Sequence, residues 1–142
     1  MHSIRQAAPS DAPQIAILLG ELGYPASEEF VLCRLSHLAQ STEDMVFIAE
    51  FRGEIVGFLA FHIIPLFHVE GGLGRIIALS VSSRSQRQGI GSKLIAAAEQ
   101  FAWERGCVRI EVTSGDHRAD AHAFYEAVGY RMDIRRFLKS RP

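Results

Sequence analysis

Hydrophobic positions change their spacing along the chain, and each change marks a predicted element. Period-two alternation or a continuous apolar run predicts strands over residues 3–7, 45–51, 54–64, 73–81, 107–114 and 134–139. Apolar residues at helical spacing predict helices over about 11–22, 27–40, 89–105 and 118–128. This order is typical of an α/β (α+β) fold, with a mixed central sheet of about six to seven strands and helices on both faces.

Residues at the ends of these segments agree with the assignment. Ser27 is followed by two glutamates and suits the start of a helix, because its hydroxyl can accept a hydrogen bond from a free N–H group. Gly23 and Gly129 follow two apolar helical patterns and predict where those helices end. Arg52-Gly53 separates two strand patterns and predicts a hairpin.

Length and composition indicate one domain over residues 1–142 of an ordinary globular type. The chain has 142 residues, of which 48% are hydrophobic and 22% charged. The first residues, MHSIRQAAPSDAP, lack the apolar core of a signal peptide. The longest apolar stretch, IVGFLAFHIIPLF, is too short to cross a bilayer. We therefore expect a cytoplasmic protein without a membrane partner.

The net charge of −1 conceals an uneven distribution. Residues 1–70 contain nine acidic and three basic residues, whereas residues 71–142 contain seven acidic and twelve basic residues. The basic half suits an anionic ligand. The acidic half suits a cationic ligand, or simply a well-solvated surface.

Two glycines, Gly89 and Gly91, stand between a buried strand pattern and an amphipathic helix, although glycine is unfavourable inside helices. The first N–H groups of a helix have no partner within it, and the helix dipole adds positive charge there. Without a Cβ, both positions let a phosphate approach the backbone. Between Gly71 and Ala98 there are four basic residues and no acidic one. The segment predicts a phosphate site; a loop that only needs positive φ angles is the other interpretation.

Common phosphate motifs fit this segment incompletely. Gly91-Ser92-Lys93 does not complete the P-loop pattern G-x-x-x-x-G-K-[ST]. A dinucleotide fingerprint requires a third glycine where Leu94 stands, although Glu111 follows Gly91 by 20 residues as that fingerprint would ask. The rest of such a fold would also have too little chain left.

Two segments together resemble the signatures of the GNAT N-acetyltransferase superfamily. ALSVSSRSQRQGIGSKL resembles its acyl-CoA motif, [RQ]-x-x-G-x-[GA] after an apolar strand, with Gln86, Gly89 and Gly91 at the motif positions. AHAFYEAVGY resembles the second signature, A-x-x-F-Y-x-x-x-G-[FY], from Ala121 to Tyr130. The motifs occur in the family's order, and the resemblance covers the whole chain.

This resemblance implies that acetyl-CoA is the cosubstrate. Amides of the glycine loop would surround its pyrophosphate, and the strand before the loop would pair with the pantetheine arm. The backbone amide near Leu79 would polarise the thioester carbonyl. Carried over by position, the cofactor-binding residues are Leu79, Ser80, Val81, Gln86, Arg87, Gln88, Gly89, Ile90, Gly91, Ser92, Arg118 and Phe124.

The resemblance also implies transfer of the acetyl group to a primary amine by direct attack in a ternary complex. Tyr125 matches the position of a catalytic general acid, since a phenol with a pKa of about 10 can protonate a thiolate. Its spacing with neighbouring apolar residues, taken alone, favours a core position. Arg75 stands where the family often has a glutamate base. The base is therefore left open among Glu70, His68, Glu111 and water.

Other classes of function are compatible with parts of the sequence. A non-catalytic acyl-CoA-binding or sensing module would keep the same loop. The basic end, RMDIRRFLKSRP, suits nucleic acid only weakly, because the pI is 6.6 and aromatic residues are not interleaved, so we expect no nucleic-acid partner. The histidines complete no usual ligand set, so we expect no metal. The acceptor is expected to be a small-molecule or peptide amine carrying positive charge, and a homodimer is left open.

Overall fold

The computed structural model describes residues 2–113, 119–133 and 135–142. Their strands are β1 (Ser3–Gln6), β2 (Asp44–Phe51), β3 (Glu54–Pro65), β4 (Gly72–Val81) and β5 (Cys107–Val112). Their α-helices are α1 (Ala12–Leu22), α2 (Glu28–Leu38), α3 (Ile90–Glu104) and α4 (Ala119–Ala127). Two short 3₁₀ turns, η1 (Pro9–Asp11) and η2 (Ser83–Ser85), precede α1 and α3.

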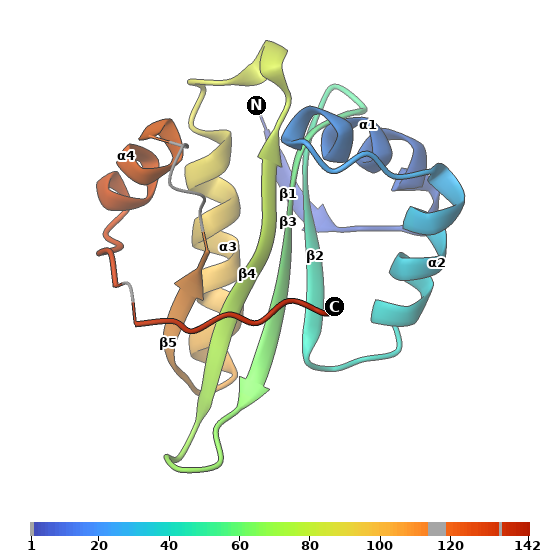
Figure 1. Ribbon diagram of the computed structural model, residues 1–142. Helices are drawn as coiled ribbons and strands as arrows, with labels where there is room; N and C mark the ends of the chain where they lie inside the picture. Colours follow the sequence, from blue (N-terminus) through green and yellow to red (C-terminus); the bar gives the residue numbers. More distant parts are fainter. Residues whose placement is uncertain (1, 114–118, 134) are drawn as a thin grey trace.

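The strands form one mixed sheet in the order β1-β2-β3-β4-β5. Neighbours from β1 to β4 are antiparallel, and β5 is parallel to β4. Figure 1 shows α1 and α2 on one side of this sheet and α3 and α4 on the other. The predicted fold class, a mixed sheet with helices on both faces, is confirmed.

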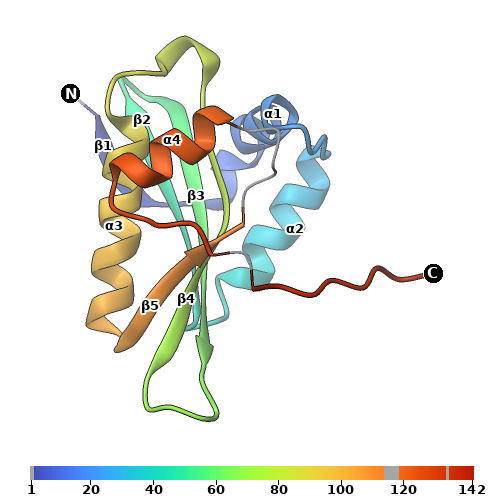
Figure 2. The same cartoon turned by 60° about the vertical axis from the view of Figure 1, so that its left-hand side comes forward.

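The predicted count of six to seven strands is wrong, because the described residues form a sheet of five. The predicted strand over residues 134–139 accounts for the difference: its described residues, 135–139, are not in a strand. The side chain of Phe137 is exposed, and Figure 2 shows this end of the chain leaving the body of the protein. A strand needs a neighbour for its backbone hydrogen bonds, and sequence pattern alone does not supply one.

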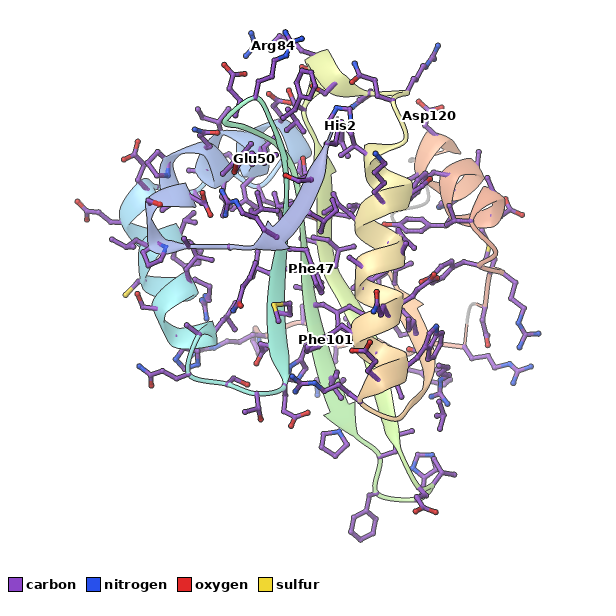
Figure 3. The ribbon with its side chains drawn as sticks, turned by 180° about the vertical axis from the view of Figure 1, so that it is seen from behind. His2, Phe47, Glu50, Arg84, Phe101 and Asp120 are labelled. Atoms are coloured by element: carbon purple, nitrogen blue, oxygen red, sulfur yellow. The ribbon has the colours of Figure 1, made fainter. Side chains whose placement is uncertain are left out.

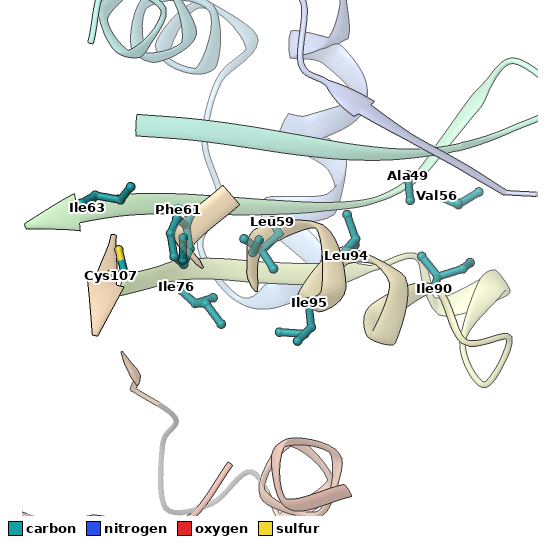
Figure 4. Packing of buried hydrophobic residues seen from close by; sticks show 12 residues of the cluster. Ala49, Val56, Leu59, Phe61, Ile63, Ile76, Ile90, Leu94, Ile95 and Cys107 are labelled. Atoms are coloured by element: carbon teal, nitrogen blue, oxygen red, sulfur yellow. The ribbon is translucent and has the colours of Figure 1, made fainter. Parts of the chain in front are cut away.

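Two apolar clusters hold the helices to the sheet. On one face, Leu94 and Ile95 of α3 pack with Leu59 of β3, and these side chains are at most 2% exposed (Figure 4). On the other face, Leu18 of α1 packs with Phe58 of β3. Burying a side chain of this size stabilises the fold by about 1.5–3 kcal/mol. The sheet is therefore covered on both sides, and its ends remain available for a site.

Local signals in the sequence are confirmed at three boundaries. The Ser27 hydroxyl accepts a hydrogen bond of 3.0 Å from the Phe30 N–H at the start of α2. Gly23 ends α1 with a left-handed φ of 102°. Arg52 and Gly53, with φ angles of 52° and 79°, form the turn between β2 and β3.

Candidate functional site

Strands β4 and β5 separate partway along their length. Their parallel pairing runs from Gly72 with Cys107 to Ile76 with Val112, where β5 ends. β4 continues to Val81 and, among the described strands, has only β3 beside it there. Residues 77–81 of β4 thus present an edge to which an extended ligand could add as a strand does.

A cleft of about 720 Å³ lies at this fork, a volume typical of small-molecule sites. One wall comes from the end of α1 and the residues after it, which we call the α1–α2 segment (residues 19–24). The other walls come from β4, the loop before α3, the start of α3, the end of β5 and α4. The cleft is lined by Leu19, Leu22, Tyr24, Ile77, Ala78, Leu79, Val81, Ser85, Gln86, Arg87, Gly89, Ile90, Gly91, Ser92, Val112, Thr113, Asp120, Ala121, Phe124 and Tyr125.

Most residues predicted from the sequence meet at this cleft. Those that line it are Leu79, Val81, Gln86, Arg87, Gly89, Ile90, Gly91, Ser92, Phe124 and Tyr125. Ser80 and Gln88 are not among the lining residues. The Ser80 hydroxyl is buried beneath α1, where it donates a 3.2 Å hydrogen bond to the Leu18 carbonyl. Arg118 lies outside the described residues. That the lining residues bind a cofactor stays a prediction.

The N-terminus of α3 forms one end of the cleft. Gly89 is its N-cap residue and has a left-handed φ of 76°, which glycine adopts without steric cost. Ile90, Gly91 and Ser92 are the first helical residues, so the positive end of the helix dipole lies at the cleft. Figure 3 shows Arg84 on the loop before α3 at the same end of the molecule. This end of the cleft suits an anion.

Tyr125 and Tyr130 have different surroundings. The ring of Tyr125 packs edge-on between Phe124, at 5.2 Å, and Tyr130, at 5.9 Å between ring centres. The Tyr130 hydroxyl donates a 3.0 Å hydrogen bond to Glu99, and burial together with the charge of Glu99 raises the pKa of Tyr130. Tyr125, but not Tyr130, lines the cleft. Tyr125 is therefore the better placed proton donor of the two.

Several lining residues were missed by sequence reasoning. Leu19 and Leu22 belong to the apolar stripe of α1 and gave no sign of a site. Ile77 and Thr113 lie where β4 and β5 separate, which no local pattern predicts. Tyr24 did carry a signal: it is a large aromatic residue directly after the glycine that ends α1, and its side chain is 66% exposed.

Neither a metal centre nor a membrane segment is found in the part of the chain that the structure describes. No three histidine, cysteine or acidic side chains in that part are grouped so that they would hold a metal ion. None of the helices there combines the length and the apolar character needed to span a membrane.

Comparison with known proteins agrees with the geometry. The model of the acetyltransferase (GNAT) family matches residues 12–130. An uncharacterized N-acetyltransferase of Bacillus subtilis (strain 168) is 30% identical over 142 residues, which cover 92% of this chain and 91% of that protein. An aminoalkylphosphonate N-acetyltransferase of Salmonella typhimurium is 36% identical over 88 residues, or 62% of this chain and 57% of that enzyme. Both relatives carry the name of the enzyme class expected from the sequence.

Solved structures share the whole fold. A crystal structure described as a transcriptional regulator from Bacillus halodurans superimposes with a TM-score of 0.89 at 26% identity, covering 99% of each chain. The family model spans most of the sequence, and the Bacillus subtilis relative aligns over nearly its full length. The chain belongs to the acetyltransferase (GNAT) family.

Proposed function

We propose that this protein transfers the acetyl group of acetyl-CoA to a primary amine by direct attack within a ternary complex. The observation that supports this most is the composition of the cleft. One cleft combines the N-terminus of α3, Tyr125 and the part of β4 beyond Ile76, along which no described strand pairs on the β5 side. A phosphate site, a strand-like edge and a proton donor are the three features that acetyl-CoA and its leaving thiolate require.

Cofactor binding divides between two elements in this proposal. The amides of Ile90, Gly91 and Ser92 take the pyrophosphate at the positive end of the helix, and Arg87 adds a cation beside them. Residues 79–81 of β4 pair with the pantetheine arm through their backbone. The thioester then lies between β4 and α4, next to Tyr125.

The chemical step needs an uncharged amine and a proton for sulfur. The amine nitrogen attacks the thioester carbonyl carbon, and the backbone N–H near Leu79 donates a hydrogen bond to the oxygen that gains charge. The C–S bond then breaks, the acetyl group stays on the nitrogen, and the thiolate takes the proton of the Tyr125 hydroxyl. The acetylated nitrogen loses its extra proton through water, which restores the Tyr125 hydroxyl.

The acceptor enters beside the α1–α2 segment, whose Leu19, Leu22 and Tyr24 form the opposite wall. The name of the Salmonella typhimurium relative describes a small amine as its substrate. We propose a small-molecule or peptide amine that arrives with positive charge, since the first half of the chain is acidic. The second candidate function is a non-catalytic acyl-CoA-binding module, which Arg75 favours because a guanidinium cannot act as a base.

Binding is tested by introducing a carboxylate at the anion site. Ser92 is exposed at the third position of α3, where the helix dipole stabilises a negative side chain, so Ser92→Glu should keep the fold. The new carboxylate should repel the pyrophosphate and weaken acetyl-CoA binding by at least about tenfold, measured by titration calorimetry. Ala96→Glu adds the same charge to the exposed side of the same helix, away from the cleft, and should bind normally. Equal affinity in all three proteins would reject the site.

Turnover is tested by thiol release from acetyl-CoA over a panel of amines. The panel contains aminomethylphosphonate, an aminoglycoside, a polyamine, free amino acids and a lysine peptide. Acetylation of at least one amine, confirmed by mass, supports the proposal. Tight acetyl-CoA binding without turnover on any of them would support the non-catalytic module instead.

A further inference from the structure

Four polar residues lie in register across four neighbouring strands. Asp44 of β2 is opposite His62 of β3, His62 is opposite Arg75 of β4, and Arg75 is opposite Glu111 of β5. Residues directly opposite one another share a face of the sheet. We call these four residues the cross-strand row.

The face that carries the row follows from its neighbours in sequence. Phe61, Ile76 and Ile110 precede or follow row residues and pack in the cluster beneath α3. Side chains alternate between faces along a strand, so the row lies on the other face, which α1 and α2 partly cover. The side chain of His62 is 38% exposed there.

Asp44 and His62 are hydrogen-bonded as a pair. The Nδ1 atom of His62 lies 2.8 Å from Oδ1 of Asp44, whose side chain is 16% exposed. A carboxylate accepts a hydrogen bond and therefore selects the tautomer with the proton on Nδ1. The lone pair of Nε2 then remains available to accept a proton. This arrangement is one that orients a histidine base.

The row ends beside the cleft at Glu111, although none of its four residues lines the cleft itself. The Arg75–Glu111 pair comes one residue before Ile76 and Val112, the last pair before β4 and β5 separate. Val112 lines the cleft, and so does Thr113, two residues beyond Glu111. The row therefore stands at the closed end of the fork, on the face where the α1–α2 segment forms a wall.

The other candidate bases are less well placed. Glu111 is held in two ion pairs, by Arg75 at 3.1 Å and by Arg109 at 2.8 Å. His68 and Glu70 lie on the loop between β3 and β4, at the end of the sheet opposite the loop before α3 (Figure 1). Of these groups, only His62 combines an orienting carboxylate with a position in the row that ends beside the cleft.

We propose that His62 is the general base of the reaction and that Asp44 is its positioning residue. This inference rests on the proposed acetyl transfer. Arg75 occupies the position where the resemblance to the family implies a glutamate base, and the register places His62 directly across from it on β3. The proposed base therefore lies on the strand next to the family's position, on the same face of the sheet.

The proton moves as follows. Nε2 of His62 accepts a proton from the ammonium of the bound acceptor, which becomes a neutral amine with a free electron pair. His62 lies three residues along β3 from Leu59, the partner of Leu79, a span of about 10 Å, so ordered water carries the proton between them. The imidazolium faces Asp44, with Arg75 beside it and Glu111 beyond, and releases its proton to solvent after the transfer.

The test uses the best acceptor of the panel and compares wild type, His62→Gln and His68→Gln between about pH 6 and pH 10, a range that includes the pKa of an amine. At neutral pH, His62→Gln should lower kcat/KM by about 10²-fold, the lower end for general base catalysis, with unchanged acetyl-CoA affinity. The deficit should shrink as the pH approaches the pKa of the amine, because the amine then arrives neutral. His68→Gln should match wild type.

Asp44→Asn supplies a second measurement, because it keeps the shape of the side chain and removes the charge. It should lower kcat about tenfold without changing acetyl-CoA affinity, as expected for a group that orients the base. A less basic analogue of the acceptor, neutral at pH 7, should be acetylated at similar rates by wild type and His62→Gln. If His62→Gln does not fold, judged by its thermal transition, His62→Asn replaces it.

The outcomes separate the two proposals. If wild type acetylates an amine and His62→Gln has the same kcat/KM, His62 is not the base. The same holds if the deficit in kcat/KM of His62→Gln is constant over pH. Both results leave the proposed acetyl transfer intact. Wild type without turnover on any amine rejects acetyl transfer and the base with it.

Discussion

The ring of Phe124 on α4 fills the space beside Gly91 on α3. A Cβ built at Gly91 would lie 3.0 Å from Cζ and 3.1 Å from Cε1 of that ring, closer than side-chain atoms normally pack. Both residues line the cleft. The missing side chain at Gly91 thus lets α4 approach the start of α3, in addition to any ligand that the helix N-terminus binds.

We predict that Gly91→Ala lowers the free energy of unfolding by up to about 1 kcal/mol, because the cost of overpacking against Phe124 exceeds the roughly 1 kcal/mol that alanine gains over glycine in a helix. In a Phe124→Leu background the same change should cost less, by about 0.5 kcal/mol or more, because the smaller side chain leaves room for the methyl group. Urea denaturation of the four proteins in this cycle measures the coupling. Additive effects would contradict the packing explanation.

Replacing Tyr125 by phenylalanine should separate binding from chemistry. If the hydroxyl protonates the thiolate, kcat should fall by about 10²-fold or more, since the thiolate must leave without a proton donor. Acetyl-CoA affinity should change little. Tyr130→Phe is the matched control: it removes the hydrogen bond to Glu99 outside the cleft and should lower stability rather than kcat. Wild-type turnover in Tyr125→Phe would reduce Tyr125 to a packing residue.

Acid stability should depend on Asp11, which anchors the start of α1 to the sheet. Two guanidinium nitrogens of Arg5 contact its carboxylate at 2.8 and 2.9 Å, and the Ala8 N–H donates to it at 2.7 Å. The hydrogen bond from Arg5 lowers the pKa of Asp11. This pair therefore stabilises the fold fully above the pKa of about 3.9 that an unfolded aspartate has, and the contribution disappears as the pH falls through the lower folded value.

Asp11→Asn should accordingly cost about 2–3 kcal/mol at pH 7, less than a fully buried pair because Arg5 is 37% exposed. The difference from wild type should narrow as the pH falls below about 4. Urea denaturation of both proteins at several pH values measures this difference in the free energy of unfolding. Glu50→Gln, which removes the other carboxylate partner of Arg5, should have a smaller effect; an equal effect would show that Asp11 has no special role.

Capture of a cationic acceptor should depend on salt. Raising the ionic strength from 0.1 M to 1 M shortens the screening length from about 10 Å to 3 Å, so kcat/KM should fall severalfold. Exposed Glu28 and Glu29 at the start of α2 are the candidates for this attraction. The double change to glutamine should reduce the salt dependence, whereas Glu104→Gln at the end of α3 should not. A salt-independent kcat/KM would leave these acids as solvating groups only.

The sequence by itself determined the features that depend on neighbouring residues. Ser27 caps α2, Gly23 ends α1, and Arg52-Gly53 turns between strands, because capping and positive φ angles are local properties. Apolar periodicity located the strands and helices as far as α4, and two motifs identified the family. Most residues predicted around the glycine loop do line the cleft. They could be predicted together because they are consecutive in the chain.

Only the tertiary structure decided what depends on strand register and packing between distant segments. Residues 135–139 have no neighbouring strand, so the predicted last strand is absent there. The pairing of Asp44 with His62, and of His62 with Arg75, joins residues far apart in sequence, and a shift of one position would turn each side chain to the other face. Long-range register is set by the packing of both faces at once, and no local pattern carries that information.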